Sequence, residues 1–348
     1  MKYRITSSTK VVDNITLHRI ECVTAFGDVE CGEKGGWIES EDNLSQDGDA
    51  WVSGDATVNG NATVDGNAWV GGNATVCGDA KVCGNATVDG DAKVCGDAWV
   101  GGDATVNGNA KVCGNATVDG DAKVCGDAKV CGNATVDGNA KVGGDATVGD
   151  NATVDGYAKV DGNAWVDGNA TVGDNATVDG YAKVGGDAWV DGNAKVCGYA
   201  TVGGDAKVCG NATVCGNATV DGNAKVCGNA KVCGNATVDG NAKVDGNAAI
   251  SGDAVVSGDT AISGDAKVDG NADYIVFKNW WSSGRYFTWT RSNNKWKVGC
   301  FYGSGEELIA KAYKDCEKSG REYERVVQYV NDILKEDNDN GNRNKREG

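Results

Sequence analysis

Cysteine is the residue type whose positions in this chain suggest chemistry. Eleven of the fifteen cysteines occupy the same place in a repeated six-residue unit, directly after a valine, as Cys77 follows Val76. Thiols at a regular spacing could form disulfides if the fold brings them together, or could bind a soft metal ion. A structural explanation also exists, because other units carry Asp, Gly, Asn or Ser at this place.

The six-residue unit recurs without insertion or deletion across residues 47–272. Valine or isoleucine stands at every sixth position from Val52 to Val268, which makes 37 consecutive units. An uninterrupted period of this length predicts a solenoid, in which each unit packs only against its neighbours. The consensus of the unit is V-x-G-D/N-A-T/K/W. Valine and alanine are its apolar positions, glycine with the following Asn or Asp suits a turn, and the residues beside valine must point outward.

This consensus matches the pattern L/I/V-G/A/E/D-x-x-S/T/A/V-x, and the repeat therefore resembles the hexapeptide-repeat proteins. The resemblance implies an all-β solenoid, a left-handed parallel β-helix with three units in each 18-residue coil. Thirty-seven units make about twelve coils, and at about 4.8 Å between strands the rod is on the order of 60 Å long. Residues 18 apart are then expected to lie directly above one another.

Wound at this spacing, the cysteines fall into columns. Neighbouring Cα atoms would be about 4.8 Å apart, which is within the range of a disulfide. Lys93, Lys111 and Lys129 flank the first column, and a nearby ammonium group favours the thiolate. Disulfides between coils, soft-metal binding and drift within a tolerant position all stay open. The columns are Cys77, Cys95, Cys113 and Cys131; Cys197, Cys215 and Cys233; and Cys209 with Cys227.

Three carboxylates, Asp119, Asp137 and Asp155, are also expected to form a column. Carboxylates at this spacing repel one another, so they could hold a cation or have raised pKa values. Screening by solvent is the structural alternative. No cofactor is expected from the sequence.

The charge of the chain limits its partners. The formal net charge is −17, and the repeat carries 30 Asp and 14 Lys with no Glu or Arg. Nucleic-acid binding is not expected, because phosphate requires a basic surface. An acidic rod could bind cations, a basic partner or a protein that normally binds DNA, although its charge also explains solubility.

The sequence predicts neither a signal peptide nor a contact with a membrane. Residues 1–10 are polar, and no apolar run approaches the roughly 20 residues of a membrane span. We therefore expect a cytoplasmic protein, in which the cysteines would be reduced thiols.

Residues 1–46 are expected to form an N-terminal β cap. Residues 2–5 and 17–24 alternate as strands do. Trp37, in the segment that enters the first coil, is expected to cover the open end of the core, because an uncapped solenoid exposes apolar surface and unpaired strand edges.

Residues 273–335 are expected to form a small α+β cap domain with two or three antiparallel strands followed by two helices. Ser304 and Glu307 could form a capping box. The first helix is expected to run to about Cys316, with a break near Ser319 and Gly320, and the second from about Arg321 to Leu334. The polar residues 336–348 predict a disordered tail. An aromatic cluster is expected to form the core of this domain or, alternatively, a ligand or partner surface: Trp280, Trp281, Tyr286, Phe287, Trp289 and Trp296.

The segments GGWIESEDNL, FKNW and GCFYGSGEEL, together with the repeat, resemble uncharacterised, acetyltransferase-like hexapeptide-repeat proteins of bacteria and their phages. Acyltransferases with this repeat use a histidine base at the groove between subunits of a trimer, and a loop that interrupts the coils. Here the repeat has neither, and the one histidine, His18, lies in the N-terminal cap.

We therefore expect a non-catalytic scaffold built on a rigid acidic solenoid, whose caps recognise a protein partner. The alternatives are an acyltransferase-like enzyme and a phage-encoded acidic decoy for a host protein. The enzyme relatives imply a homotrimer, whereas the smooth charged faces offer no obvious interface, so the oligomeric state stays open.

Overall fold

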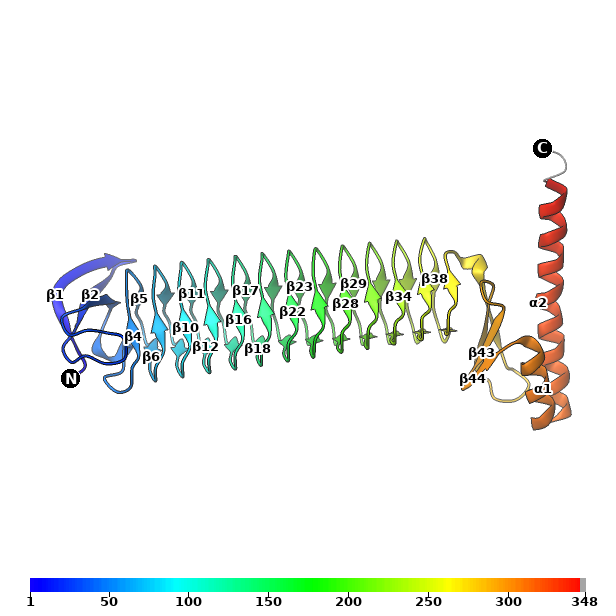
Figure 1. Ribbon diagram of the computed structural model, residues 1–348, viewed down its shortest axis with the longest axis horizontal. Helices are drawn as coiled ribbons and strands as arrows, with labels where there is room; N and C mark the ends of the chain where they lie inside the picture. The colour runs from blue at the N-terminus through cyan, green and yellow to red at the C-terminus, as the bar shows by residue number, and fades with distance from the viewer. Residues whose placement is uncertain (345–348) are drawn as a thin grey trace.

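The computed structural model describes residues 1–344, and the side chains of residues 1–337. A long rod carries a small β unit at its N-terminal end and an α+β unit at its C-terminal end (Figure 1). The rod is a parallel β-solenoid, and the predicted fold class is confirmed in these features.

Two-residue strands form the rod, from β4 (Trp51–Val52) to β40 (Lys267–Val268). Each strand begins six residues after the one before it, so that β5 is Thr57–Val58 and β6 is Thr63–Val64. Within the rod, a strand pairs in parallel with the third strand before it and the third after it, as β5 pairs with β8 (Thr75–Val76). The pairing repeats every 18 residues, which confirms the expected coil.

Three flat walls enclose the core of the rod. The first wall is a 15-stranded sheet that contains β5, the second is a 13-stranded sheet that begins at β4, and the third is a 12-stranded sheet that begins at β6. The rod therefore has about 13 coils, slightly more than predicted from the units alone. The extra strand is β3 (Lys34–Ile38), which precedes the repeat and pairs in parallel with β5.

Valine and alanine fill the interior of the rod. The repeated valines from Val52 to Val268, the isoleucines that replace two of them, and the repeated alanines from Ala50 to Ala266 are at most 1% exposed. The strand pleat explains this, because valine points inward while its neighbours point outward. One unit carries Thr260 in place of alanine. It is 3% exposed, and its hydroxyl donates to the carbonyl of Ser257 at 2.7 Å.

The corners of the coils need a backbone conformation that favours glycine. At Gly102, φ is +58°, and a Cβ atom there would lie 2.7 Å from the carbonyl oxygen of Gly120 in the next coil. Two corners carry aspartate instead, at Asp150 and Asp174, with φ of +53° and +52°. Aspartate tolerates this left-handed region better than most residues.

The N-terminal cap is a hairpin that prolongs the first wall. β1 (Tyr3–Val12) and β2 (Ile15–Cys22) pair antiparallel around Asp13 and Asn14, whose φ values of +50° and +66° suit a type I′ turn. β2 pairs in turn with β3.

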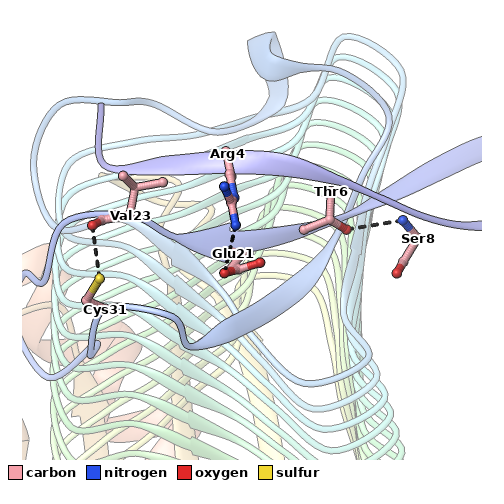
Figure 2. Close-up of polar contacts among 6 residues, drawn as sticks. All are labelled: Arg4, Thr6, Ser8, Glu21, Val23 and Cys31. Atoms are coloured by element: carbon pink, nitrogen blue, oxygen red, sulfur yellow. Dashed lines mark hydrogen bonds and ion pairs between the residues drawn. The ribbon is translucent and has the colours of Figure 1, made fainter.

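Polar contacts hold the two strands of the hairpin together and tie its end to the loop that follows. An ion pair of 3.1 Å joins Arg4 to Glu21 across the two strands, and the Cys31 thiol donates to the Val23 carbonyl at 3.1 Å (Figure 2). A short 3-10 helix, Glu41–Asn43, leads into the first coil.

The prediction that Trp37 covers the open end of the core is wrong. Trp37 is half-exposed on the outside of the cap, where Lys10 and Arg19 lie 4.7 and 5.1 Å from its ring centroid. Register is the reason, because β3 places Trp37 beside the outward Thr57 and places Ile38 beside the inward Val58. The residues that are fully buried at this end include Tyr3, Ile20, Ile38 and Trp51.

The C-terminal unit is a four-stranded antiparallel sheet with two helices. Its sheet covers the last coils, since the amide of Ala261 donates to Thr288 at 3.3 Å and that of Lys267 donates to Ser292 at 2.7 Å. The elements are the 3-10 helix Asn271–Asp273, β41 (Tyr274–Lys278), β42 (Tyr286–Thr290), β43 (Lys295–Val298), β44 (Phe301–Gly303), α1 (Gly305–Asp315) and α2 (Glu317–Asn344).

The first helix begins and ends as expected, but the second begins earlier. Ser304 forms the predicted capping box with Glu307 at the start of α1. The first helix ends with Cys316 as its C-cap, as expected. The second begins at Glu317 rather than near Arg321. Ser319 and Gly320, where a break was expected, therefore lie within the first turn of α2. The helix then continues through residues 336–344, where a tail was expected, since an established helix extends at little cost through polar residues. Residues 345–348 of that tail lie outside the described residues.

Most of the predicted aromatic core of this unit is present. Phe287, Trp289 and Trp296 are each 1% exposed, and Trp281 is half-buried. Trp280 is 74% exposed and does not belong to the core, because the buried residue of this loop is its neighbour Asn279. No helix within residues 1–344 is long and apolar enough to cross a bilayer.

Candidate functional site

The first column of cysteines forms as predicted, on the first wall. The four strands that precede its members are paired in register, and each cysteine amide bonds to the next coil, as Cys77 does to the carbonyl of Val94 at 2.9 Å. The column therefore places Cys77, Cys95, Cys113 and Cys131 one coil apart on the outer surface.

A disulfide joins the two cysteines on the third wall. Cys209 and Cys227 are bonded, with their Cα atoms 4.6 Å apart. They follow the paired strands β30 (Lys207–Val208) and β33 (Lys225–Val226). Because 4.6 Å lies within the normal Cα range of disulfides, the coil spacing alone suffices to form this link.

The second wall holds a column of three thiols. Cys197, Cys215 and Cys233 stack at successive coils, and the sulfur atoms of Cys215 and Cys233 lie 2.6 Å apart. Three thiols can supply one disulfide and leave one free thiol beside it.

Burial raises the pKa of several thiols in the columns. Burial raises the pKa of Cys77, Cys95 and Cys197, and the opposing effects of Lys93 and Lys195 are smaller. Burial together with the neighbouring Cys233 raises the pKa of Cys215 to about 11. The lysines do lower the pKa of the thiols, as expected, but desolvation of the half-buried sulfur outweighs their effect, so the net shift is upward.

The cysteine side chains of the columns do not surround a common point at which a metal ion could bind. Within the described residues, no group of three or more His, Cys, Asp or Glu side chains is placed to hold a metal ion. Side chains in a ladder stand side by side, one coil apart, rather than around a common centre. We therefore propose no metal site at Cys77, Cys95, Cys113 or Cys131.

The aspartate column is also present on the third wall. Asp119, Asp137 and Asp155 follow strands that pair in register. Burial, then the carboxylates of Asp174 and Asp137, raise the pKa of Asp155, as expected for stacked carboxylates. Asp174 was not foreseen in this group, because it stands at a corner where other units carry glycine.

Asparagine ladders along the corners are a feature that the sequence analysis missed. Side-chain amides donate to the residue 18 positions on, from Asn115 to Asn133 at 3.0 Å and from Asn133 to Asn151 at 2.9 Å. The ladder continues from Asn151 to Asn169 at 3.0 Å and ends on Asp187 at 2.7 Å. The recurrence of asparagine at multiples of 18 was the available signal.

Comparison with known proteins assigns no family. No protein-family model matches the chain, and no curated protein matches it. The class of the protein therefore rests on its own geometry, which is that of a parallel β-solenoid with a structured unit at each end.

Proposed function

We propose that this protein is a non-catalytic, rigid scaffold that holds its N-terminal and C-terminal units at a fixed separation. The observation that carries the proposal is the uninterrupted stack of coils. Between residues 51 and 268, all of which are described, no loop departs from the six-residue period. A spacer needs a constant cross-section, whereas a binding groove usually requires a break in it.

Two sets of contacts make the rod stiff. The valine and alanine core is continuous from end to end. Amides bond to the next coil along the whole length, for example from Trp69 to Ala86 and from Lys225 to Ala242, at 2.8 and 2.9 Å. A bend would have to open a row of such bonds and expose core, and each buried group left unpaired costs about 1–3 kcal/mol.

The enzyme alternative has less support. An acyl transferase needs a general base, and the rod contains no histidine. His18 lies on β2, where it pairs with Ile38 on one side and Thr9 on the other. As part of this proposal, the protein is similar to the hexapeptide-repeat proteins, its coils wind in a left-handed direction, and it comes from a bacterium or a phage. The proposal also includes a cytoplasmic location and a protein partner at one or both ends.

Coil deletion tests the scaffold. Removal of residues 137–190, which make up three 18-residue coils, should leave a folded rod shortened by about 14 Å, since coils rise by about 4.8 Å. Small-angle X-ray scattering would measure the maximum dimension. The matched control removes residues 137–187, which breaks the six-residue period and should disrupt the fold.

Two outcomes would contradict the proposal. A broad range of end-to-end distances for the intact protein would show that the rod is flexible rather than rigid. Saturable binding of acetyl-coenzyme A in calorimetry, with transfer of its acetyl group to an amine, would favour the enzyme. A decoy would instead bind a basic protein along the rod, and replacing the rod aspartates with asparagine would weaken that binding.

A further inference from the structure

The C-terminal sheet is strongly basic within an acidic protein. From Tyr274 to Gly305 the chain carries five lysines and arginines and no Asp or Glu, although the net charge of the whole chain is −17. The sheet lies directly against the last coils. Positive charge is therefore concentrated at the junction between the rod and the C-terminal unit.

Two neighbouring cavities share Arg285 and Gly299: one lies within the C-terminal unit, and the other lies at its junction with the rod. The first, of about 330 Å³, lies between the loop that joins β41 to β42 and the two helices, and its lining includes Ser282, Phe301 and Lys311. The second, of about 370 Å³, lies between the sheet and the coils around residues 241–261. Its lining includes Lys243, Tyr286 and Lys297.

Within residues 1–337, the cations of these cavities have no carboxylate partner. No ion pair is formed by Lys243, Arg285, Lys297 or Lys311 among these residues, whereas Arg291, directly after β42, pairs with Asp337 at 2.9 Å. Two carboxylates also line the cavities. Of these, Asp259 accepts a hydrogen bond from Asn241 at 2.9 Å, and Asp315 stands in the first cavity. Four cations against two carboxylates leave an excess of positive charge.

The loop that carries Arg285 is held in place without a ligand. Asn279, 3% exposed, receives hydrogen bonds on its side-chain oxygen from the amide and hydroxyl of Ser282, both at 3.0 Å. Its side-chain amide donates to the Tyr323 hydroxyl of α2 at 3.0 Å, and its backbone amide donates to the Arg285 carbonyl at 2.8 Å. Arg285 therefore starts from a fixed backbone, and little ordering is needed for it to bind an anion.

We propose that these adjoining cavities bind a phosphate ester of nucleotide size, with the Arg285 guanidinium at the phosphate. A guanidinium makes paired hydrogen bonds to phosphate oxygens, and lysines add charge without fixed geometry. Tyr286 is exposed and Phe301 is half-buried, and as lining residues they offer aromatic surface to the organic part of the ligand. The site does not depend on the scaffold role, because it requires only the C-terminal unit and the coils beside it.

Calorimetric titration of the full chain with ADP, without divalent cations and at low salt, tests the site. We expect saturable binding with one ligand per chain, and no heat from adenosine, because the phosphates supply the attraction. Arg285→Ala should weaken ADP binding by about tenfold or more, as befits the loss of a charge-assisted contact. Arg285→Lys should weaken it less.

The matched control is Arg4→Ala, an exposed arginine in the N-terminal cap that pairs with Glu21. It should leave ADP affinity unchanged, and circular dichroism would verify that all variants are folded. Binding of inorganic pyrophosphate as tight as that of ADP would overturn the nucleotide-sized ligand and leave only a phosphate site. The absence of saturable binding of either compound, or an equal loss in Arg4→Ala, would overturn the whole proposal.

Discussion

Cys209 and Cys227 are joined by a disulfide although 18 residues separate them, because each stands directly after a valine of paired strands in successive coils. Their Cα atoms are 4.6 Å apart. Every other pair of neighbours in the cysteine columns has the same relation, and the thiols of Cys215 and Cys233 already lie with their sulfur atoms 2.6 Å apart. The outer surface of the rod thus carries several places where two coils can be linked covalently.

The number of thiols in each column limits the links that can form. On exposure of the native protein to a small-molecule disulfide, two column thiols become one protein disulfide, and the reagent leaves as two thiols. We expect all links to join residues 18 apart, with two links in the column of four and one in the column of three. Mass spectrometry of lysine-specific digests would map them.

Two cysteines of the rod are internal controls for this experiment. Cys83 and Cys125 occupy the same outward place, but the residues 18 positions before and after them are not cysteine. They should stay free in the native protein. The predicted stacking of the column cysteines would be contradicted by a disulfide between rod cysteines that are not 18 residues apart, or by a disulfide at Cys83 or Cys125, in the native protein.

The Cys209–Cys227 disulfide should stabilise the coils that it joins. Closing a loop of this length in the unfolded chain is worth about 3 kcal/mol in the chain-entropy model. We therefore expect Cys209→Ser to lower the free energy of unfolding by up to this amount, as measured by denaturant titration without reductant. Cys125→Ser is the matched control and should have little effect. If reductant lowers the stability of wild type and of Cys209→Ser equally, the linkage is not the cause.

The asparagine ladder should stabilise one corner of the rod. Asn151→Ala removes one hydrogen bond from Asn133 and one to Asn169. With about 0.5–1.5 kcal/mol for each bond, and the lower end expected at an exposed site, the free energy of unfolding should fall by about 1 kcal/mol. Asn163→Ala is a control at a corner where the residues 18 before and after are Asp145 and Tyr181. Equal losses in both variants would show that the ladder adds nothing.

Stability should rise as the pH falls toward the ordinary aspartate pKa of 3.8. Burial, together with nearby aspartates, raises the pKa of Asp155, Asp167 and Asp191 above the ordinary value of 3.8. The folded chain therefore holds these protons to a higher pH than the unfolded chain does. The stability that these protonated aspartates contribute is lost as the pH rises through their raised pKa values. It is regained as the pH falls through the same values.

Thermal unfolding between about pH 3 and 7, a range that includes the ordinary aspartate pKa, would measure this trend. The triple variant with asparagine at positions 155, 167 and 191 should unfold at a higher temperature than wild type near pH 7, with a weaker dependence on pH. The control removes the same number of charges through Asp97→Asn, Asp145→Asn and Asp205→Asn. If the control variant weakens the dependence of the unfolding temperature on pH by the same amount, the net charge of the rod causes that dependence rather than these three aspartates.

The order of the fold was predictable because its cause is local and repeated. The Val52 to Val268 period determined the strands and, through the hexapeptide resemblance, the coil of 18 residues. In-register stacking then placed Cys77 beside Cys95 and Asp137 beside Asp155, and the structure confirms both pairs. A solenoid allows this because each residue meets only the residues one coil away.

The ends of the chain and the chemistry of the columns depended on contacts between distant segments. The register of β3 turned Trp37 outward, and the buried Asn279 left Trp280 in solvent. Burial of the sulfur atoms, rather than the nearby lysines, decided the direction in which the pKa of Cys95 shifts. The junction that unites Lys243 with Arg285 exists because the C-terminal sheet folds back onto the last coils. The sequence by itself determined the periodic rod. Only the tertiary structure decided the two ends of the chain and the cavities near the C-terminal sheet, because these depend on packing between segments that do not repeat.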